Sequence, residues 1–161
     1  MVRGQLGGDA DSRALIAQAW TAARAIDAVV VCPGLAAPRG AREPRLDQWD
    51  DGLAVGLRGP FFLAKHAGAR LARGGGGRLV FAIGAPAPRH APIAAIVREG
   101  LIAMVDGLAR ALPRAVEVAA VLGDERTTAR RSTLQLAQGV RSIVEAEWRP
   151  RGALLDLGTR A

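Results

Sequence analysis

Four short apolar runs limit what this chain can fold into. They cover residues 28–32, 79–83, 116–122 and 153–157. Runs that are apolar at consecutive positions are typical of strands buried on both faces, as in parallel sheets. Longer segments with helical spacing of apolar residues separate them. This alternation predicts an α/β fold, a parallel sheet of about four strands with helices on both faces.

The other apolar segments predict four helices. Apolar residues recur three and four positions apart over about 11–25, 48–72, 93–111 and 128–147. Asp47 is a suitable N-cap for the second of these helices. Gly56 and Pro60 lie inside the same helix, where they predict a bend.

Composition narrows the class of protein. A chain of 161 residues, of which 50% are hydrophobic, fits one domain over 1–161, with 1–10 as a tail. The single Cys32 excludes a disulfide scaffold. No apolar run approaches a membrane span of about 18 residues. The N-terminus has no apolar signal core, so we expect a cytoplasmic protein.

The net charge of +7 is weak evidence for a nucleic-acid partner. The cationic residues are nearly all arginines spread over the whole chain, whereas nucleic-acid binders gather charge on one face beside aromatic side chains. The nearest approach to a cluster is Arg126, Arg130 and Arg131. We therefore expect neither a nucleic-acid partner nor a membrane partner.

Six segments, taken in order, match the landmarks of a known family. They are IDAVVVCPG at 26–34, the helix with GPFF at 49–63, GRLVFAI at 77–83, REGL at 98–101, VEVAAVLG at 116–123 and GALLDLG at 152–158. Their order and spacing resemble the short-chain dehydrogenase/reductase family. The resemblance implies a partial Rossmann-like fold for this chain.

The resemblance also implies what is missing. The family begins with a strand and a TGxxxGxG loop, which holds the dinucleotide pyrophosphate at a helix N-terminus. Too few residues precede Cys32 for that unit, and Gly4, Gly7 and Gly8 follow no strand. We therefore expect an N-terminally truncated member that binds no NAD or NADP unless a partner completes the site. Whether such a truncation is natural or reflects a mis-called start is left open.

The family's catalytic positions carry no equivalent chemistry here. The resemblance places its Ser at Gly84, its Tyr at Ala94, its Lys at Arg98 and the Asn of its long helix at Gly56. In the family the Tyr transfers the proton, the Lys lowers its pKa and the Ser polarises the substrate. The chain contains no Tyr or Asn at all. We expect a catalytically degenerate member that does not reduce ketones on its own.

Cys32 and His90 offer an alternative chemistry. Cys32 follows a strand, at the edge where α/β proteins bind ligands, and His90 lies in a proline-rich loop near the degenerate positions. A catalytic Cys32–His90 pair competes with the simpler interpretation of Cys32 as a buried structural cysteine. The spacing of His, Cys and carboxylates predicts no metal site.

Two helices keep the apolar residues that the resemblance assigns to assembly. In the family, the equivalents of helices 48–72 and 93–111 build a dimer interface as a four-helix bundle. The candidate interface residues are Phe61, Phe62, Ile96, Leu101 and Met104. The strand at 29–31 is also expected to leave an unpaired edge, which is a template for another chain.

These observations lead to one hypothesis and two alternatives. The first is a non-catalytic subunit that forms a homodimer, or a hetero-oligomer with an intact reductase, as scaffold or regulator. The second is a ketoreductase-type oxidoreductase whose NAD(P) site depends on a partner, or an enzyme that uses Arg98 and His90 for another reaction. The third is a truncated reading frame of such an enzyme.

Overall fold

Strands and helices alternate along the chain in this computed structural model, as the sequence predicts. The structure describes residues 8–23, 25–33, 45–84, 92–124, 129–145 and 152–156. In order, the elements are α1 (Asp9–Ala22), β1 (Ala28–Val31), α2 (Leu46–Leu53), the π-helix η1 (Ala54–Arg58), α3 (Gly59–Arg73), β2 (Gly77–Ile83), α4 (Pro92–Ala111), β3 (Val116–Leu122), α5 (Ala129–Glu145) and β4 (Ala153–Asp156).

The four strands form one parallel sheet in the order β1-β2-β3-β4. β2 and β3 pair over their whole length, from Gly77 opposite Val116 to Ile83 opposite Leu122. β1 and β4 are shorter and pair with the outer sides of this central pair. Within the described part of the chain no strand lies beyond β1, so its outer edge is open, as the sequence predicts.

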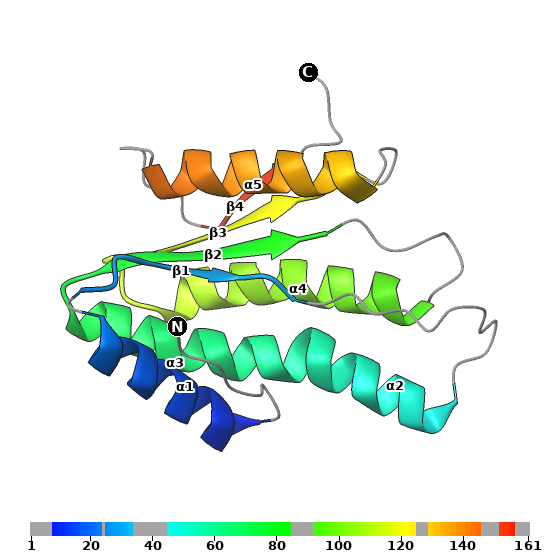
Figure 1. Cartoon of the computed structure of the whole chain (residues 1–161), viewed down its shortest axis with the longest axis horizontal. Coiled ribbons are helices and arrows are strands. Elements are labelled where there is room, and N and C mark those ends of the chain that lie inside the picture. Colours follow the sequence, from blue (N-terminus) through cyan, green and yellow to red (C-terminus); the bar gives the residue numbers. More distant parts are fainter. Residues whose placement is uncertain are drawn as a thin grey trace.

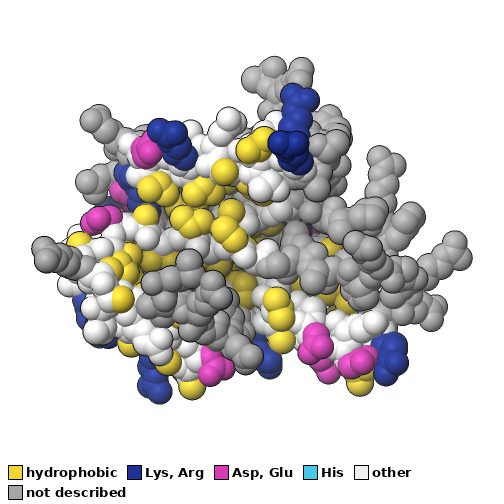
Figure 2. All heavy atoms as spheres, viewed as in Figure 1, with side chains coloured by type: hydrophobic (Ala, Val, Ile, Leu, Met, Phe, Trp, Pro, Cys, Tyr) yellow, Lys and Arg dark blue, Asp and Glu magenta, His cyan; other side chains and the backbone are white. Residues whose placement is uncertain are grey.

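Helices cover the two faces of the sheet unequally (Figure 1). α3 and α4 pack against one face, and α1 packs on α3 in the same layer. On the other face α5 covers β2 and β3 through Val80, Val121 and Ile143. Val30 of β1 and Leu155 of β4 are exposed. Figure 2 shows hydrophobic side chains along α5 and the sheet beneath it.

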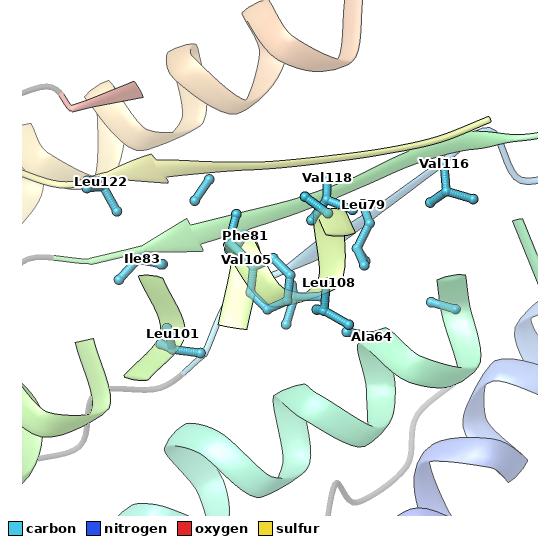
Figure 3. Packing of buried hydrophobic residues seen from close by; sticks show 14 of the residues in the cluster. Ala64, Leu79, Phe81, Ile83, Leu101, Val105, Leu108, Val116, Val118 and Leu122 are labelled. Atoms are coloured by element: carbon cyan, nitrogen blue, oxygen red, sulfur yellow. The ribbon is translucent and has the colours of Figure 1, made fainter. Parts of the chain in front are cut away.

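The larger core lies between the sheet and α3 and α4. Figure 3 shows Phe81 of β2 facing Val105 and Leu108 of α4 within this cluster. Phe81, Leu79, Leu101 and Val105 are completely buried. Full burial of one such side chain contributes about 1.5–3 kcal/mol, so this layer supplies much of the stability of the fold.

A buried ion pair ties α5 to the sheet. Arg78 of β2 lies opposite Glu117 of β3, and its Nε donates a hydrogen bond to Glu117 Oε2 over 2.8 Å. Both side chains are largely buried. The Arg78 guanidinium also donates to the carbonyl of Val144, in the last turn of α5. One arginine therefore joins two strands to the end of a helix.

The helix predicted over 48–72 is continuous but not uniform. α2 passes into η1, where the N–H of Gly59 donates to the carbonyl of Ala54, and then into α3. Pro60 has no N–H to donate to the carbonyl of Gly56, so a π-helical turn occurs where the sequence predicts a bend. The predicted N-cap was wrong: α2 starts at Leu46, and Asp47 lies in its first turn, paired with Arg45.

Glycines allow this helix to approach α4 closely. A Cβ on Gly56 would lie 2.6 Å from Cγ1 of Val97, and one on Gly52 would lie 2.7 Å from Cγ2 of Ile93. On α4, a Cβ on Gly100 would lie 2.9 Å from Cδ2 of Leu57. Real Cβ atoms are not found this close to other atoms, so the contact between α2–η1 and α4 requires glycine.

Gly56→Ala is expected to lower the free energy of unfolding by about 1–3 kcal/mol, because the new methyl group would overpack against Val97. The matched control is Gly107→Ala on α4, where a Cβ meets nothing within 4 Å. The control should raise the free energy of unfolding by up to about 1 kcal/mol through helix propensity. Urea denaturation measures both; equal stability of the two variants would contradict the glycine contact.

The start of α1 is held to α3 by a three-residue ionic cluster. Oδ1 of Asp9 accepts hydrogen bonds from Lys65 Nζ and His66 Nε2, each over 2.9 Å. The bond from Lys65, followed by that from His66, lowers the pKa of Asp9 below its ordinary value of 3.8. A lowered carboxyl pKa adds stability above the unfolded-state pKa, and this stability is lost as the pH falls through the folded-state pKa.

Asp9→Asn should therefore be less stable than the wild type near pH 7, and the difference should vanish as the pH falls well below 3.8. Asp11→Asn is the control, because Asp11 occupies the same first turn of α1 and shares its helix-dipole effect. Denaturation midpoints over a pH series measure the difference. A stability loss in Asp9→Asn that persists at the lowest pH would contradict the ionic origin.

Candidate functional site

The candidate site lies at the carboxyl edge of the sheet, where parallel α/β sheets bind ligands. β1, β2 and β3 end at this edge and are followed by Cys32, Gly84 and Gly123. The N–H of Gly123 donates to the carbonyl of Ile83 over 2.8 Å, which extends the pairing of β2 and β3 to their ends. The edge is thus a rigid frame for whatever side chains surround it.

Two of the positions that the resemblance matches to catalytic residues meet at this edge. Arg98, from α4, is 9% exposed, and its Nη1 lies 3.5 Å from the carbonyl oxygen of Gly84. Ala94, one turn earlier on α4, is buried and presents only a methyl group. The charged residues at this edge thus include Arg98, beside the end of β2, and Asp124 and Asp156, at the ends of β3 and β4.

Gly56 has a structural role that the sequence analysis missed. It is buried in η1 and contacts Val97, the neighbour of Arg98 on α4. Position 56, which the resemblance matches to the family's Asn, is therefore also a point of close contact between two helices. The spacing of Gly52 and Gly56, four residues apart on one helix face, is the sequence signal that could have revealed it.

Cys32 is a free cysteine directly after β1, and it is exposed, so its interpretation as a buried structural cysteine was wrong. Desolvation by partial burial raises the pKa of its thiol above the ordinary value of 9.0. The nucleophilic thiolate is therefore a minor species at neutral pH. His90 lies outside the described residues, so the Cys32–His90 pair stays a hypothesis.

No metal centre is found among the described residues, where no three His, Cys, Asp or Glu side chains gather in a suitable arrangement. In the same part of the chain, no helix is both long and apolar enough to cross a membrane.

The predicted interface residues fall into two groups. Phe61 and Ile96 are each 43% exposed, and Phe62 and Met104 are half-buried. Leu101 is 0% exposed and packs in the core, so its inclusion among surface residues was wrong. The cause is that one side of α4 faces the sheet along the whole helix, while apolar residues such as Ile96 lie outside that buried side.

An open groove runs along this helix face. Its volume is about 750 Å³, and its lining includes Asp50, Ala54, Leu57, Phe61, Phe62 and Met104. The rings of Phe61 and Phe62 pack edge to face, with centroids 5.4 Å apart. The ammonium group of Lys65 lies 5.4 Å from the centroid of the Phe62 ring. The lining is apolar apart from Gly100 and three charged residues, which are Asp50, Asp51 and Arg58.

Comparison by sequence finds no relative: no protein-family model matches the chain, and no curated protein does either. Comparison by structure finds many matches. A 3-ketoacyl-ACP reductase of Sinorhizobium meliloti superposes with a TM-score of 0.79 at 18% identity, over 97% of this chain and 76% of that one.

Two further structures agree. A double variant of a Serratia marcescens short-chain dehydrogenase/reductase gives a TM-score of 0.74 at 23% identity, over 96% of this chain and 73% of that one. The 3-ketoacyl-(acyl-carrier-protein) reductase of Brucella melitensis, complexed with NADH, gives a TM-score of 0.74 at 18% identity, over 99% of this chain and 77% of that one. This chain thus spans about three quarters of each of these structures, and it has the fold of the short-chain dehydrogenases/reductases, as its sequence motifs predict.

Proposed function

We propose that this chain is a non-catalytic subunit with a short-chain reductase fold, which acts as a scaffold or regulator of an intact reductase in the cytoplasm. The observation that carries the proposal is the buried methyl group of Ala94 where the resemblance expects the proton-transferring Tyr, beside Gly84 where it expects the Ser. A carbonyl reduction needs an acid within hydrogen-bond reach of the substrate oxygen. Arginine does not serve as such an acid, because a guanidinium holds its proton in proteins.

The surface along α3 and α4 supports a role in assembly. Phe61 and Ile96 expose large apolar side chains next to a groove lined by Phe62 and Met104. Exposed apolar surface of this kind marks interfaces with other proteins. The proposal covers both a homodimer through this face and a hetero-oligomer with an intact reductase. It includes no nucleic-acid or membrane partner.

The alternative is an oxidoreductase that needs a partner for its NAD(P) site. It is favoured by the Brucella structure, a reductase complexed with NADH, and by the positive charge retained at Arg98. The alternative gains a dinucleotide site on this chain when its partner is present, whereas the proposed subunit gains none, so the two functions differ in a measurable property.

Light scattering on the purified chain should give a mass above that of a 16.8 kDa monomer. Phe61→Ala should shift the species toward monomer, since truncating an aromatic at the centre of an interface costs about 2 kcal/mol or more. Met104→Glu should do the same by placing an unpaired charge in the apolar groove. The control is Leu134→Ala, which removes an exposed leucine from α5. A wild type that stays monomeric at high concentration excludes the homodimer.

Titration calorimetry with NADPH and NADH should detect no binding to the isolated chain at micromolar concentrations. A micromolar dissociation constant corresponds to about 8 kcal/mol of binding free energy, which requires a built site. Stoichiometric binding in that range would refute the proposed subunit and favour the oxidoreductase.

A further inference from the structure

α1 depends on α3 for its place in the fold. Its main packing partner among the described elements is α3, and it is the outermost helix of the layer that it forms with α3 and α4 (Figure 1). Its N-cap is Gly8, which has no side chain to accept a hydrogen bond from the first turn. A helix of 14 residues is only marginally stable in water by itself. α1 therefore stays folded in place through its contacts with α3.

The buried face of α1 contains both a favourable and an unfavourable contact. Ile16 is buried in the larger core, where the half-buried Trp20 packs beside it. Ser12, one turn before Ile16, is 0% exposed, and its hydroxyl group has no hydrogen-bond partner among the described residues. A hydroxyl buried in this way loses its bonds to water and gains none in return. Ser12 therefore favours a state in which α1 is released and the hydroxyl is hydrated.

Ionic contacts with α3 oppose that release. Oδ1 of Asp9 accepts hydrogen bonds from Lys65 Nζ and His66 Nε2, each over 2.9 Å. Within the described part of the chain, these are the ion pairs that join α1 to another element. The side chains of Asp9 and Lys65 are 43% and 51% exposed, so dissolved salt screens their attraction. The connection between α1 and α3 thus weakens as the salt concentration rises.

The same lysine reaches the groove beside α3. Its ammonium group lies 5.4 Å from the centroid of the Phe62 ring, and Phe62 lines the groove. While α1 is in place, the charge of Lys65 is paired with Asp9. Release of α1 leaves that ammonium group without its partner, next to the aromatic wall of the groove. One side chain thus connects the position of α1 to the groove.

We propose that α1 is a strap, which the contacts of Asp9 hold closed on α3 and which opens while the sheet and the other helices stay folded. The open strap exposes the face that carries Ile16 and Trp20, and it frees Lys65 at the groove. This inference goes beyond the proposed subunit function and does not depend on how the chain assembles.

Hydrogen exchange of the full chain at increasing urea concentrations tests whether α1 opens separately. We expect the amides of α1 to be about tenfold or more less protected than those of β2 and β3, which exchange through global unfolding. Exchange in α1 should also depend more weakly on urea, because opening one helix exposes far less surface than unfolding the chain.

The Asp9→Asn variant tests which contact closes the strap. It should speed exchange in α1 by about two- to fivefold, since it removes a partly exposed ion pair. The matched control is Asp11→Asn, which alters the same first turn and removes no ion pair of the described residues. Sodium chloride should speed exchange in α1 of the wild type and have much less effect in Asp9→Asn.

Ser12→Ala should act in the opposite direction. Removal of the unpartnered hydroxyl should slow exchange in α1 by about fivefold or more. Thr21→Ala is its control, because it removes an exposed hydroxyl from the same helix and gains at least as much helix propensity. The control should therefore slow exchange in α1 less than Ser12→Ala does.

Four results would each overturn the proposal. They are equal protection and urea dependence in α1, β2 and β3, an α1 exchange rate that does not respond to salt, equal rates in Asp9→Asn and Asp11→Asn, and an effect of Ser12→Ala no larger than that of Thr21→Ala. The first two measurements use the wild type alone, so they decide the proposal even if a variant does not fold.

Discussion

The pairing of β2 with β3 is the contact on which the other elements depend. Seven residues of each strand lie in parallel register, and β3 is buried at every position. A parallel pair buried on both faces needs a cover on each side. α4 and α3 supply it on one face and α5 on the other, where Arg78 and Glu117 join the two strands to the end of α5. The outer strands are covered less completely, which leaves Val30 and Leu155 exposed.

The close contact between α2–η1 and α4 links this core to the candidate site. Gly52 and Gly56 let the two helices approach until Ile93 and Val97 fill the places of their missing side chains. The approach fixes α4, and α4 in turn carries Arg98 to the carboxyl end of β2. The position of the guanidinium thus follows from helix packing that begins with glycines on another element.

The sequence predicted the order of the elements well, because consecutive apolar residues and the helical period both report burial directly. It could not predict which face each helix covers, since periodicity identifies a buried face but not its partner. The π-helical turn at 54–58 depends on Pro60 and on packing against Val97 together. The bonds from Lys65 and His66 to Asp9 join residues more than fifty positions apart. Leu101 and Met104 belong to the same apolar stripe of α4 in the sequence. Only the structure shows that Leu101 is in the core while Met104 is half-buried.

Within the candidate site, the structure brings Arg98 to within 3.5 Å of the Gly84 carbonyl oxygen, and the packing role of Gly56 came only from the structure. An Asn at position 56 would drive its Cβ into the γ-methyl groups of Val97, the residue before Arg98. Relief of that clash requires movement of α4, and such movement would displace the guanidinium from Gly84. An amide at position 56 therefore requires Val97 to move, whereas a Cβ at position 84 would meet no atom of the described residues within 4 Å.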